Sequence, residues 1–232
     1  MNDPTDLSGT LLIIPTKNEQ EAIEGLVSES RAIGFSNILV IDGFSSDFTS
    51  EIAKKVGARV IFQEFGNGKG CAVRTGMKEF LQGNYEHLCM IDGDGSNAPS
   101  SVINMISTAK MQKADVVLGS RTQGHRDKKA MNLLSLASNL TVSFLLGIKF
   151  GRIFTDVQTG YWLLTRDAVE RVYPHIESSG FEIELELFVT VLRMKMRVIE
   201  IPAEFRRRKG HSKFSFELRL RNLYYAFKFL LS

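Results

Sequence analysis

The sequence predicts an α/β fold with a mostly parallel, Rossmann-like sheet flanked by helices. Short apolar runs alternate with segments of helix length, and runs such as LLII, ILVI and VVLG are apolar on both faces, as in buried parallel strands. Alternation at this spacing is typical of βαβ units. The 232 residues suffice for one such domain, and a charged fraction of 24% is ordinary for a globular protein, which excludes collagen, a coiled coil and low-complexity disorder.

Each expected element follows from this alternation. The expected strands of the first half are 11–15, 37–42, 59–63, 87–92 and 115–120. The helices between them are 19–33, 47–56, 69–81 and 99–111. After residue 121 we expect a helix over 130–148, a strand over 161–165, helices over 167–173 and 181–194, and a strand over 197–205. Residues 1–232 thus form a single domain with its body over about 10–213, ending in a basic amphipathic helix over about 214–231.

The helix expected over 130–148 has a membrane alternative. The 19 uncharged residues before Lys149 would nearly match the hydrocarbon thickness of a bilayer. However, an apolar stripe and a polar stripe run along the segment at helical spacing, and polar groups are costly in hydrocarbon. The apolar stripe is Leu133, Ala137, Leu140, Phe144 and Ile148, and the polar stripe is Asn132, Ser135, Asn139 and Ser143. We therefore interpret the segment as an amphipathic helix rather than a membrane span.

Positive charge is concentrated at the C-terminus. From residue 206 onward there are eight Lys or Arg residues and one acidic residue, whereas the rest holds 21 basic and 25 acidic residues. We expect this tail to attract anions and its helix to lie on an anionic membrane surface, with a core-packed terminal helix as the alternative. Nucleic acid is not expected as a partner, because the basic core of the tail lacks interleaved aromatic residues and the pI is only about 8.8.

The termini and cysteines indicate the compartment. The N-terminal sequence MNDPTDLSGT is polar and has no basic residue, which excludes a secretory signal. Two cysteines, Cys71 and Cys89, exclude a disulfide scaffold and a cysteine-rich zinc module. These features predict a cytoplasmic protein, associated peripherally with a membrane through its tail.

Acidic residues, glycines and a few cations follow the expected strands, at the edge of the sheet where such folds bind ligands. Asp92 and Asp94 come directly after an apolar strand, and alternate residues of an extended segment share a face. Two close carboxylates repel each other and either share a proton or bind a cation, and oxygen ligands favour Mg²⁺ or Mn²⁺. A solvated Asp-Gly turn is the alternative.

Three further groups lie at this edge. Asp42 ends the second strand and can accept hydrogen bonds from a base or ribose, with a turn role as the alternative. The segment 66–70, GNGKG, opens a helix whose N-terminus suits an anion, and Lys69 adds a full charge. Its spacing is neither that of a Walker loop nor that of the GxGxxG fingerprint. The acidic set within 182–186 fits either a site or a solvated helix start.

Eight segments, in order along the chain, resemble family 2 glycosyltransferases, most closely those like dolichol-phosphate mannosyltransferase. They are IIPTKNE, VIDGFSSDFT, GNGKGCAVRTGM, MIDGDGSNAP, VVLGSR, TDVQTGYWLLTRDAVE, GFEIELEL and VIEIPAEFRRRKGHSKF. Eight matches in family order are far more specific than any one of them, and they cover nearly the whole chain.

The resemblance implies a glycosyltransferase A-type fold and an inverting, metal-dependent transfer from a nucleotide-diphospho-sugar, such as GDP-mannose or a UDP-sugar, to a polyprenyl phosphate. Catalysis would fall to Asp94, Arg121 and Arg206. Nucleotide binding would fall to Pro15, Glu19, Asp42, Lys69 and Asp92, and Mg²⁺ or Mn²⁺ to Asp92 and Asp94. The acceptor and phosphate charge would fall to Arg121, Ser135, Asp156, Arg206, Arg208 and Lys213.

The sequence departs from the family pattern at three places. Gly43 stands where a second Asp often follows the second strand, and Ser96 opens a segment that often contains His-Pro-Pro. Met131 replaces an Arg that polyprenyl-phosphate enzymes often carry, although Lys128 and Lys129 lie nearby. The last departure leaves the lipid acceptor less firmly implied than the donor.

Three other functions fit some of these features. A family 2 transferase with an alcohol acceptor, soluble or saccharide, would need a base, for which Asp156 and Glu184 are candidates. A sugar-1-phosphate nucleotidyltransferase is disfavoured, because IIPTKNE stands where its Gly-rich loop would be. A non-catalytic module could bind nucleic acid or an anionic membrane through the basic tail alone.

Overall fold

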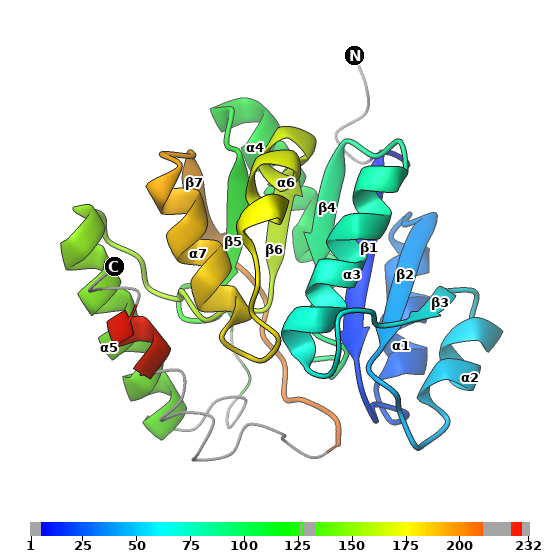
Figure 1. Cartoon of the computed structure of the whole chain (residues 1–232). Helices are drawn as coiled ribbons and strands as arrows, with labels where there is room; N and C mark the ends of the chain where they lie inside the picture. Colours follow the sequence, from blue (N-terminus) through cyan, green and yellow to red (C-terminus); the bar gives the residue numbers. More distant parts are fainter. Residues whose placement is uncertain (1–5, 126, 128–132, 211–223, 229–232) are drawn as a thin grey trace.

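The structure is a computed structural model that describes residues 6–125, 127, 133–210 and 224–228 (Figure 1). These residues form a single mixed α/β domain. Its strands are β1 (Thr10–Thr16), β2 (Asn37–Asp42), β3 (Arg59–Phe62), β4 (His87–Met90), β5 (Val116–Ser120), β6 (Trp162–Thr165) and β7 (Val198–Pro202). Its helices are α1 (Ile23–Ala32), α2 (Thr49–Lys55), α3 (Lys69–Gln82), α4 (Ser101–Gln112), α5 (Leu133–Phe150), α6 (Arg166–Val172) and α7 (Ile183–Arg193), with a 3₁₀ helix over Tyr173–His175.

The strands form one seven-stranded sheet in the order β3-β2-β1-β4-β6-β5-β7. Only β6 runs antiparallel, against β4 and β5, and the other pairs are parallel. The carboxyl ends of the parallel strands therefore meet at one edge of the sheet, the lower edge in Figure 1. This is the mostly parallel sheet that the sequence predicted.

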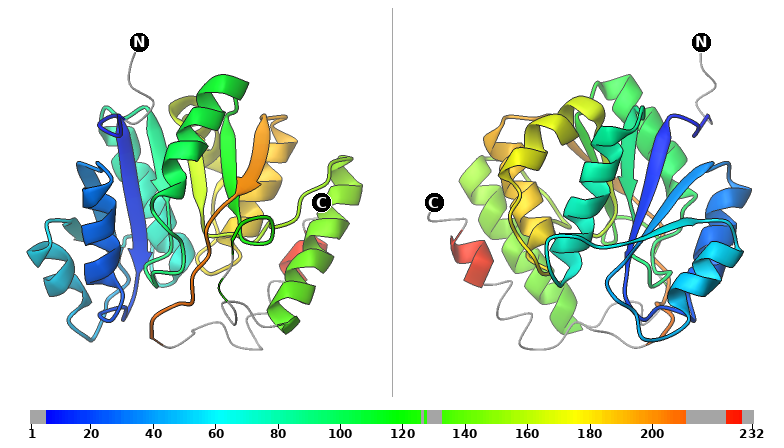
Figure 2. Two further views of the ribbon diagram at one scale, coloured as in Figure 1. Left: turned by 180° about the vertical axis from the view of Figure 1, so that it is seen from behind. Right: turned by 45° about the vertical axis from the view of Figure 1, so that its right-hand side comes forward.

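Helices cover both faces of the sheet. α3, α6 and α7 pack on one face, and α1 and α4 pack on the other (Figures 1 and 2). Successive residues of a strand point to opposite faces. Accordingly Leu11 and Ile13 of β1 lie in the core under α3, and Leu12 and Ile14 lie in the core under α1. Both faces of the central strands are buried, which explains their unbroken apolar runs.

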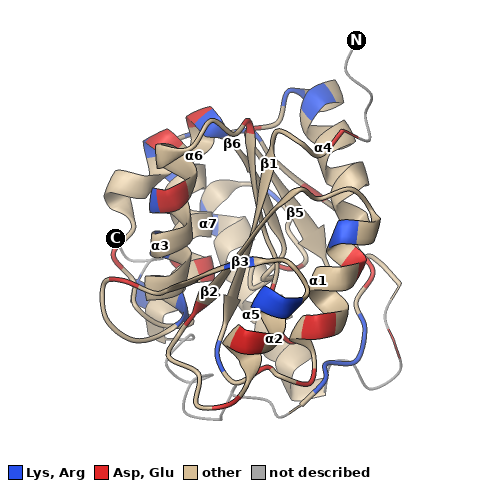
Figure 3. Cartoon of the chain, turned by 90° about the vertical axis from the view of Figure 1, so that its right-hand side faces the viewer, with Lys and Arg blue, Asp and Glu red and all other residues tan. Residues whose placement is uncertain are grey.

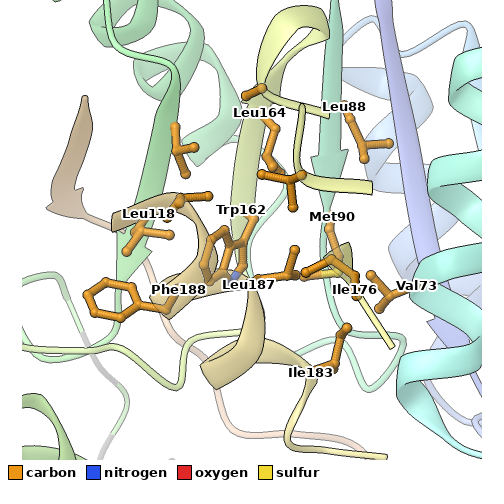
Figure 4. Close-up of a cluster of buried hydrophobic side chains, with 14 of the residues drawn as sticks. Val73, Leu88, Met90, Leu118, Trp162, Leu164, Ile176, Ile183, Leu187 and Phe188 are labelled. Carbon is orange, nitrogen blue, oxygen red and sulfur yellow. The ribbon is translucent and has the colours of Figure 1, made fainter. Parts of the chain in front are cut away.

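Trp162 anchors the larger core. It is fully buried, and Figure 4 shows it among Leu118, Leu187 and Phe188. Its indole N–H donates a 2.7 Å hydrogen bond to the carbonyl of Thr159. A rigid aromatic side chain thus fixes the backbone just before β6, which reaches the ligand-binding edge.

Every strand and helix expected from the alternation is present, and the differences lie at their ends. The helix expected from residue 19 begins at Ile23, because residues 20–22 form a turn. The strand expected over 197–205 ends at Pro202, and the last backbone hydrogen bond to β5 runs from the Ala203 N–H to the Ser120 carbonyl at 3.1 Å. The chain after Pro202 then crosses the carboxyl edge of the sheet (Figure 1).

α5 lies apart from the other helices (Figure 1), and its buried face mixes the polar residues Asn139 and Ser143 with the apolar residues Val142 and Leu146. Helices of globular proteins usually bury their apolar stripe. In α5, Asn139 and Ser143 are only 2% and 1% exposed, whereas Phe144 and Ile148 are 67% and 65% exposed. The buried side chains have specific partners, since the Asn139 amide donates to the Thr155 carbonyl at 3.0 Å and the Ser143 hydroxyl accepts from the backbone of residue 157.

Two observations bear on membrane contact. Among the described residues, α5 alone is long and apolar enough to cross a bilayer by length and composition, and it is mostly not buried in the domain. The expected C-terminal helix is described only over 224–228, which are helical, and Ala226 is buried in the core that also holds Val142 of α5. The rest of the segment 214–231 lies outside the described residues.

The burial of Asn139 and the exposure of the apolar stripe of α5 lead to a testable prediction about substitutions in this helix. We expect Asn139→Leu to lower the free energy of unfolding by about 1–3 kcal/mol, because it leaves the Gln158 N–H without its acceptor and removes the nearer of two donors to the Thr155 carbonyl. Leu140→Gln, on the exposed side, should change it by less than about 0.5 kcal/mol. Urea unfolding measures both, and a larger loss for Leu140→Gln would contradict the orientation of α5.

Candidate active site

Charged side chains from seven segments meet at the carboxyl edge of the sheet. They come from the loops after β1, β4 and β5, the N-termini of α3 and α7, the segment before β6, and the segment after β7. In Figure 3, acidic and basic segments lie close together at the lower end of the molecule. The cluster has the position that the sequence predicted for a ligand-binding site.

Asp92 and Asp94 follow β4, and Asp92 is held by a buried cation. Lys69, the first residue of α3, pairs with both Asp92 and Glu184. Burial disfavours the Asp92 carboxylate, but the charges of Lys69, Arg121 and Arg208 outweigh it and lower the pKa of Asp92. Asp92 is therefore ionised at neutral pH.

A glycine allows this approach. A Cβ on Gly160 would lie 2.2 Å from Oδ2 of Asp92, so any other residue there would clash with the carboxylate. Only the tertiary structure shows that Gly160 lies against Asp92. It follows that the loop before β6 and the loop after β4 form one wall of the site.

One acid from the start of α7, Glu184, belongs to the charged cluster through its pair with Lys69. Glu184 is 6% exposed, and its pKa is raised by burial, with Lys69 opposing and Asp92 adding to the rise. Burial alone would lower the pKa of Lys69, but Asp92 and Glu184 together raise it. The two acids thus keep Lys69 charged in a nearly closed position.

Asp94 faces a second cation. Its Oδ2 lies 3.4 Å from the Arg208 guanidinium, which also contacts Glu19 at 3.2 Å. Its Oδ1 accepts a 2.9 Å hydrogen bond from the backbone N–H of Ser96. The structure therefore brings the predicted residues Glu19, Asp92, Asp94, Lys69 and Arg208 into one charged cluster.

The backbone after β7 holds Arg208 at this place. The Arg206 N–H donates to the Ser96 carbonyl at 2.7 Å, and the Lys209 N–H donates to the Asp94 carbonyl at 3.1 Å. Asn97 and Phe205 form an antiparallel bridge in the same stretch. The segment after β7 is thus hydrogen-bonded alongside the loop that carries Asp94.

The predicted catalytic role of Arg206 is not favoured by this geometry. Its guanidinium makes a bidentate pair with Glu29 at 2.8 and 3.0 Å, and its Nε donates to Glu204 at 2.8 Å. These contacts tie the segment to α1, on the side of the sheet away from Lys69. Hydrogen bonds to these two acids also raise the pKa of Arg206. The catalytic role of Arg206 stays a prediction.

Arg121, after β5, is held by Asp156 in a buried bidentate pair. Its Nε and Nη2 lie 2.7 and 2.6 Å from the two Asp156 oxygens, and its backbone N–H donates to Asp156 as well. The guanidinium also lies over the ring of Phe205, 5.5 Å from its centroid. Asp156 is fully buried, so its carboxylate is committed to Arg121 rather than open to a ligand.

Glu200 of β7 positions this pair and was missed in the sequence. Its carboxylate accepts hydrogen bonds from the backbone of Thr155 and Asp156 at 2.9 and 2.7 Å, and from the Gln123 side chain at 2.9 Å. Burial raises the pKa of Glu200, although the hydrogen bonds from Thr155 and Asp156 oppose the rise. The available signal was a lone acid in the otherwise apolar strand VIEIP.

The other predicted residues have varied surroundings. Asp42 is 1% exposed and accepts hydrogen bonds from the Ser45 backbone and from the hydroxyls of Ser45 and Ser50, which is the turn role left open by the sequence. Pro15 is buried next to the end of β1, and Ser135 lies in the first turn of α5. Lys213 lies outside the described residues.

The carboxylates of the site are suitable ligands for a divalent cation. Asp92 and Asp94 supply hard oxygen ligands one residue apart, and each already faces a positive group, Lys69 or Arg208. Within the described residues, no group of three His, Cys, Asp or Glu side chains is arranged around one point. Such a pair is completed by oxygens of a bound ligand, as Mg²⁺ commonly is with phosphates.

Comparisons with known proteins agree with this geometry. The family model described as Glycosyl transferase family 2 matches residues 11–173. The chain is 33% identical over 194 residues to the glycosyltransferase AglJ of Haloferax volcanii, covering 84% of this chain and 62% of the relative. It is 29% identical to the undecaprenyl-phosphate mannosyltransferase of Micrococcus luteus, over 88% of this chain and 87% of the relative.

A further relative and a solved structure extend the comparison. The UDP-N-acetylglucosamine–dolichyl-phosphate N-acetylglucosaminyltransferase of Methanococcus voltae is 25% identical, over 82% of this chain and 83% of its own. The glucosyl-3-phosphoglycerate synthase of Mycobacterium tuberculosis, solved with Mn²⁺ and UDP, has a TM-score of 0.73 at 15% identity, over 96% of this chain and 80% of its own. Such structure neighbours have the glycosyltransferase A-type fold that was expected.

The Arg121–Asp156 pair predicts a large and specific loss of stability. Asp156→Asn leaves a nearly buried guanidinium without its counterion, which we expect to lower the free energy of unfolding by about 3 kcal/mol or more. The matched change Asp167→Asn breaks an exposed pair with Arg171 and should cost less than about 1 kcal/mol. Urea unfolding measures both losses, and equal losses would contradict the assigned burial.

Proposed function

Because this chain belongs to glycosyltransferase family 2, we propose that it transfers a sugar, with inversion, from a nucleotide-diphospho-sugar to a polyprenyl phosphate, using Mg²⁺ or Mn²⁺. The observation that carries the proposal is the pair Asp92 and Asp94, which stands at the carboxyl edge of the sheet among Lys69, Arg121 and Arg208. Two acids can bind a metal ion and the cations around them can bind a diphosphate, so the cluster suits a metal-bound diphosphate ligand.

The donor side of the site follows from these charges. Asp92 and Asp94 would hold the divalent cation, which supplies Lewis-acid stabilisation to the leaving diphosphate. Lys69 keeps Asp92 ionised and oriented, and Arg208 provides donors for phosphate oxygens. The nucleoside would lie toward Pro15, Glu19 and Asp42, at the ends of β1 and β2.

The acceptor side needs positioning rather than a base. A phosphate monoester is already anionic, so its attack on the sugar requires orientation and cationic steering. Arg121 sits on this side, fixed by Asp156 and close enough to Asp92 to lower its pKa. Glu184 is paired with Lys69 and is not needed as a base for such an acceptor.

The lipid nature of the acceptor is supported by α5. A bilayer surface would cover its exposed apolar stripe, and the cations Lys149 and Arg152 at its C-terminal end suit anionic headgroups. A cavity of about 450 Å³ with an almost wholly apolar lining lies between α5 and the segment 151–155. Relatives of this chain named above act on undecaprenyl or dolichyl phosphate, so we propose peripheral association with a membrane.

The donor is tested by thermal shift with a panel of nucleoside diphosphates and nucleotide sugars, each with and without Mn²⁺. A ligand that binds the native state raises the melting temperature as ln(1 + [L]/Kd). A metal-dependent shift with one base supports the proposal and selects the sugars to assay. Polyprenyl phosphate and a water-soluble acceptor are then compared, and turnover of the soluble acceptor without gain from the lipid would overturn the acceptor class.

Asp94→Asn tests the metal role. It keeps the shape of the side chain but removes its charge, and we expect metal-dependent turnover to fall by about 100-fold or more while the melting temperature stays within a few degrees. Asp167→Asn, remote and exposed on α6, should retain full activity. Activity near that of the wild type in Asp94→Asn would remove Asp94 from the mechanism.

The exposed face of α5 gives a separate prediction. We expect the double variant Phe144→Gln, Ile148→Gln to reduce binding to phosphatidylcholine vesicles with one quarter phosphatidylglycerol by about 10-fold, because two apolar side chains no longer enter the bilayer. Phe48→Gln removes an equally exposed aromatic ring from the far side of the domain and should change nothing. Vesicle cosedimentation measures both, and unchanged binding of the double variant would refute this contact.

A further inference from the structure

We propose that the Arg208 guanidinium neutralises Asp94 in the ligand-free site, as a metal ion otherwise would. The metal ion then binds weakly until the donor diphosphate draws Arg208 away from Asp94. This inference rests on the proposed function and deepens it. It makes Arg208 the residue that couples metal binding to nucleotide binding, which is a distinct role from merely contacting phosphate.

The position of Arg208 is the first argument. Its Nη1 lies 3.4 Å from Oδ2 of Asp94, and its Nη2 lies 3.2 and 3.5 Å from the two oxygens of Glu19. The guanidinium therefore bridges the loop after β1 and the loop after β4. A divalent cation bound to the same Asp94 oxygen would be its near neighbour, and like charges at this range repel each other.

Backbone hydrogen bonds hold residue 208 next to the loop of Asp94, where its side chain competes with a metal ion for the Asp94 carboxylate. Hydrogen bonds from the Arg206 and Lys209 N–H groups to the loop of Asp94 hold both sides of residue 208. The side chain can therefore leave Asp94 by rotating its own torsions, while the main chain stays where it is. A short side-chain movement suffices to exchange one anionic partner for another.

An unsatisfied donor indicates the second partner. The Nε of Arg208 is buried without a hydrogen-bond partner among the described residues. Buried polar groups are normally hydrogen-bonded, and a guanidinium N–H is well matched to a phosphate oxygen. A diphosphate would give this N–H an acceptor, which neither Asp94 nor Glu19 provides in the ligand-free site.

Lys69 is not equivalent to Arg208 in this respect. Lys69 is 11% exposed and is shared between Asp92 and the buried Glu184, so its departure would leave two acids unpaired. The Arg208 side chain is 25% exposed and has weaker contacts with both of its acids. Of the two cations, Arg208 is the one that can exchange partners at low cost.

The consequence is a measurable coupling between two ligands. Without nucleotide, the charge of Arg208 lowers the affinity of Asp94 for the metal ion. With nucleotide, Arg208 binds the diphosphate and no longer lowers that affinity. The metal must then favour nucleotide binding by the same factor, because coupling free energies are reciprocal.

The test measures Mn²⁺ affinity by electron paramagnetic resonance or calorimetry, first without nucleotide and then with saturating UDP or GDP. In Arg208→Gln we expect Mn²⁺ to bind at least about 5-fold more tightly without nucleotide, and the gain in affinity on adding nucleotide to shrink by a similar factor. Arg207→Gln is the matched control. It removes the same charge from an exposed neighbour that forms no ion pair with Asp94, so both affinities should stay unchanged.

Each outcome has a clear meaning. Equal Mn²⁺ affinity without nucleotide in the wild type and in a folded Arg208→Gln variant overturns the inference, and the proposed function still stands. Arg208→Lys keeps the charge and should retain the weak metal binding of the wild type, so it serves if Arg208→Gln does not fold. If no protein of the set binds Mn²⁺ with any nucleotide, the proposed function and this inference both fall.

Discussion

The site depends on the repulsion between two carboxylates, Asp92 and Asp94, placed one residue apart where β4 ends. Without a metal ion their charge must be balanced by the protein, and each faces its own cation, Lys69 or Arg208. Lys69 is kept charged in its buried position by a second acid, Glu184. Other charged groups of the site can be understood as partners of these groups, which explains why acids and bases from distant segments meet at one edge.

Close backbone contacts make this arrangement possible. Gly68 and Gly70 let the start of α3 touch the segment before α7, since a Cβ at either position would lie 2.3 or 2.2 Å from a carbonyl oxygen of residues 178–179. The Gly70 N–H donates to the Gly180 carbonyl across this contact. The glycines expected to cradle an anion therefore also fix α7, and with it Glu184, beside Lys69.

A second set of contacts connects the charged cluster to α5. Glu200 holds the backbone of Thr155 and Asp156, and Asp156 holds Arg121. The same segment accepts a hydrogen bond from Asn139 of α5. The helix that carries the exposed apolar stripe is thus joined through short polar contacts to Arg121, which we propose for the acceptor side. This geometry suits the proposed transfer of a sugar to a phosphate at a lipid surface.

The sequence by itself determined the α/β class, the strands and helices to within a few residues at their ends, the family, and the edge of the sheet where Asp92, Asp94 and Lys69 meet. These features follow from local periodicity and from residues that directly follow strands, so short windows of sequence carry them. Tertiary structure alone decided which partner each charge takes. Arg206 pairs with Glu29 on α1, Arg208 pairs with Asp94, Glu200 is a positioning residue, and α5 buries Asn139 and Ser143 while its apolar stripe is exposed. These pairings join residues far apart in the chain, and their choice depends on burial and distance, which no local pattern encodes.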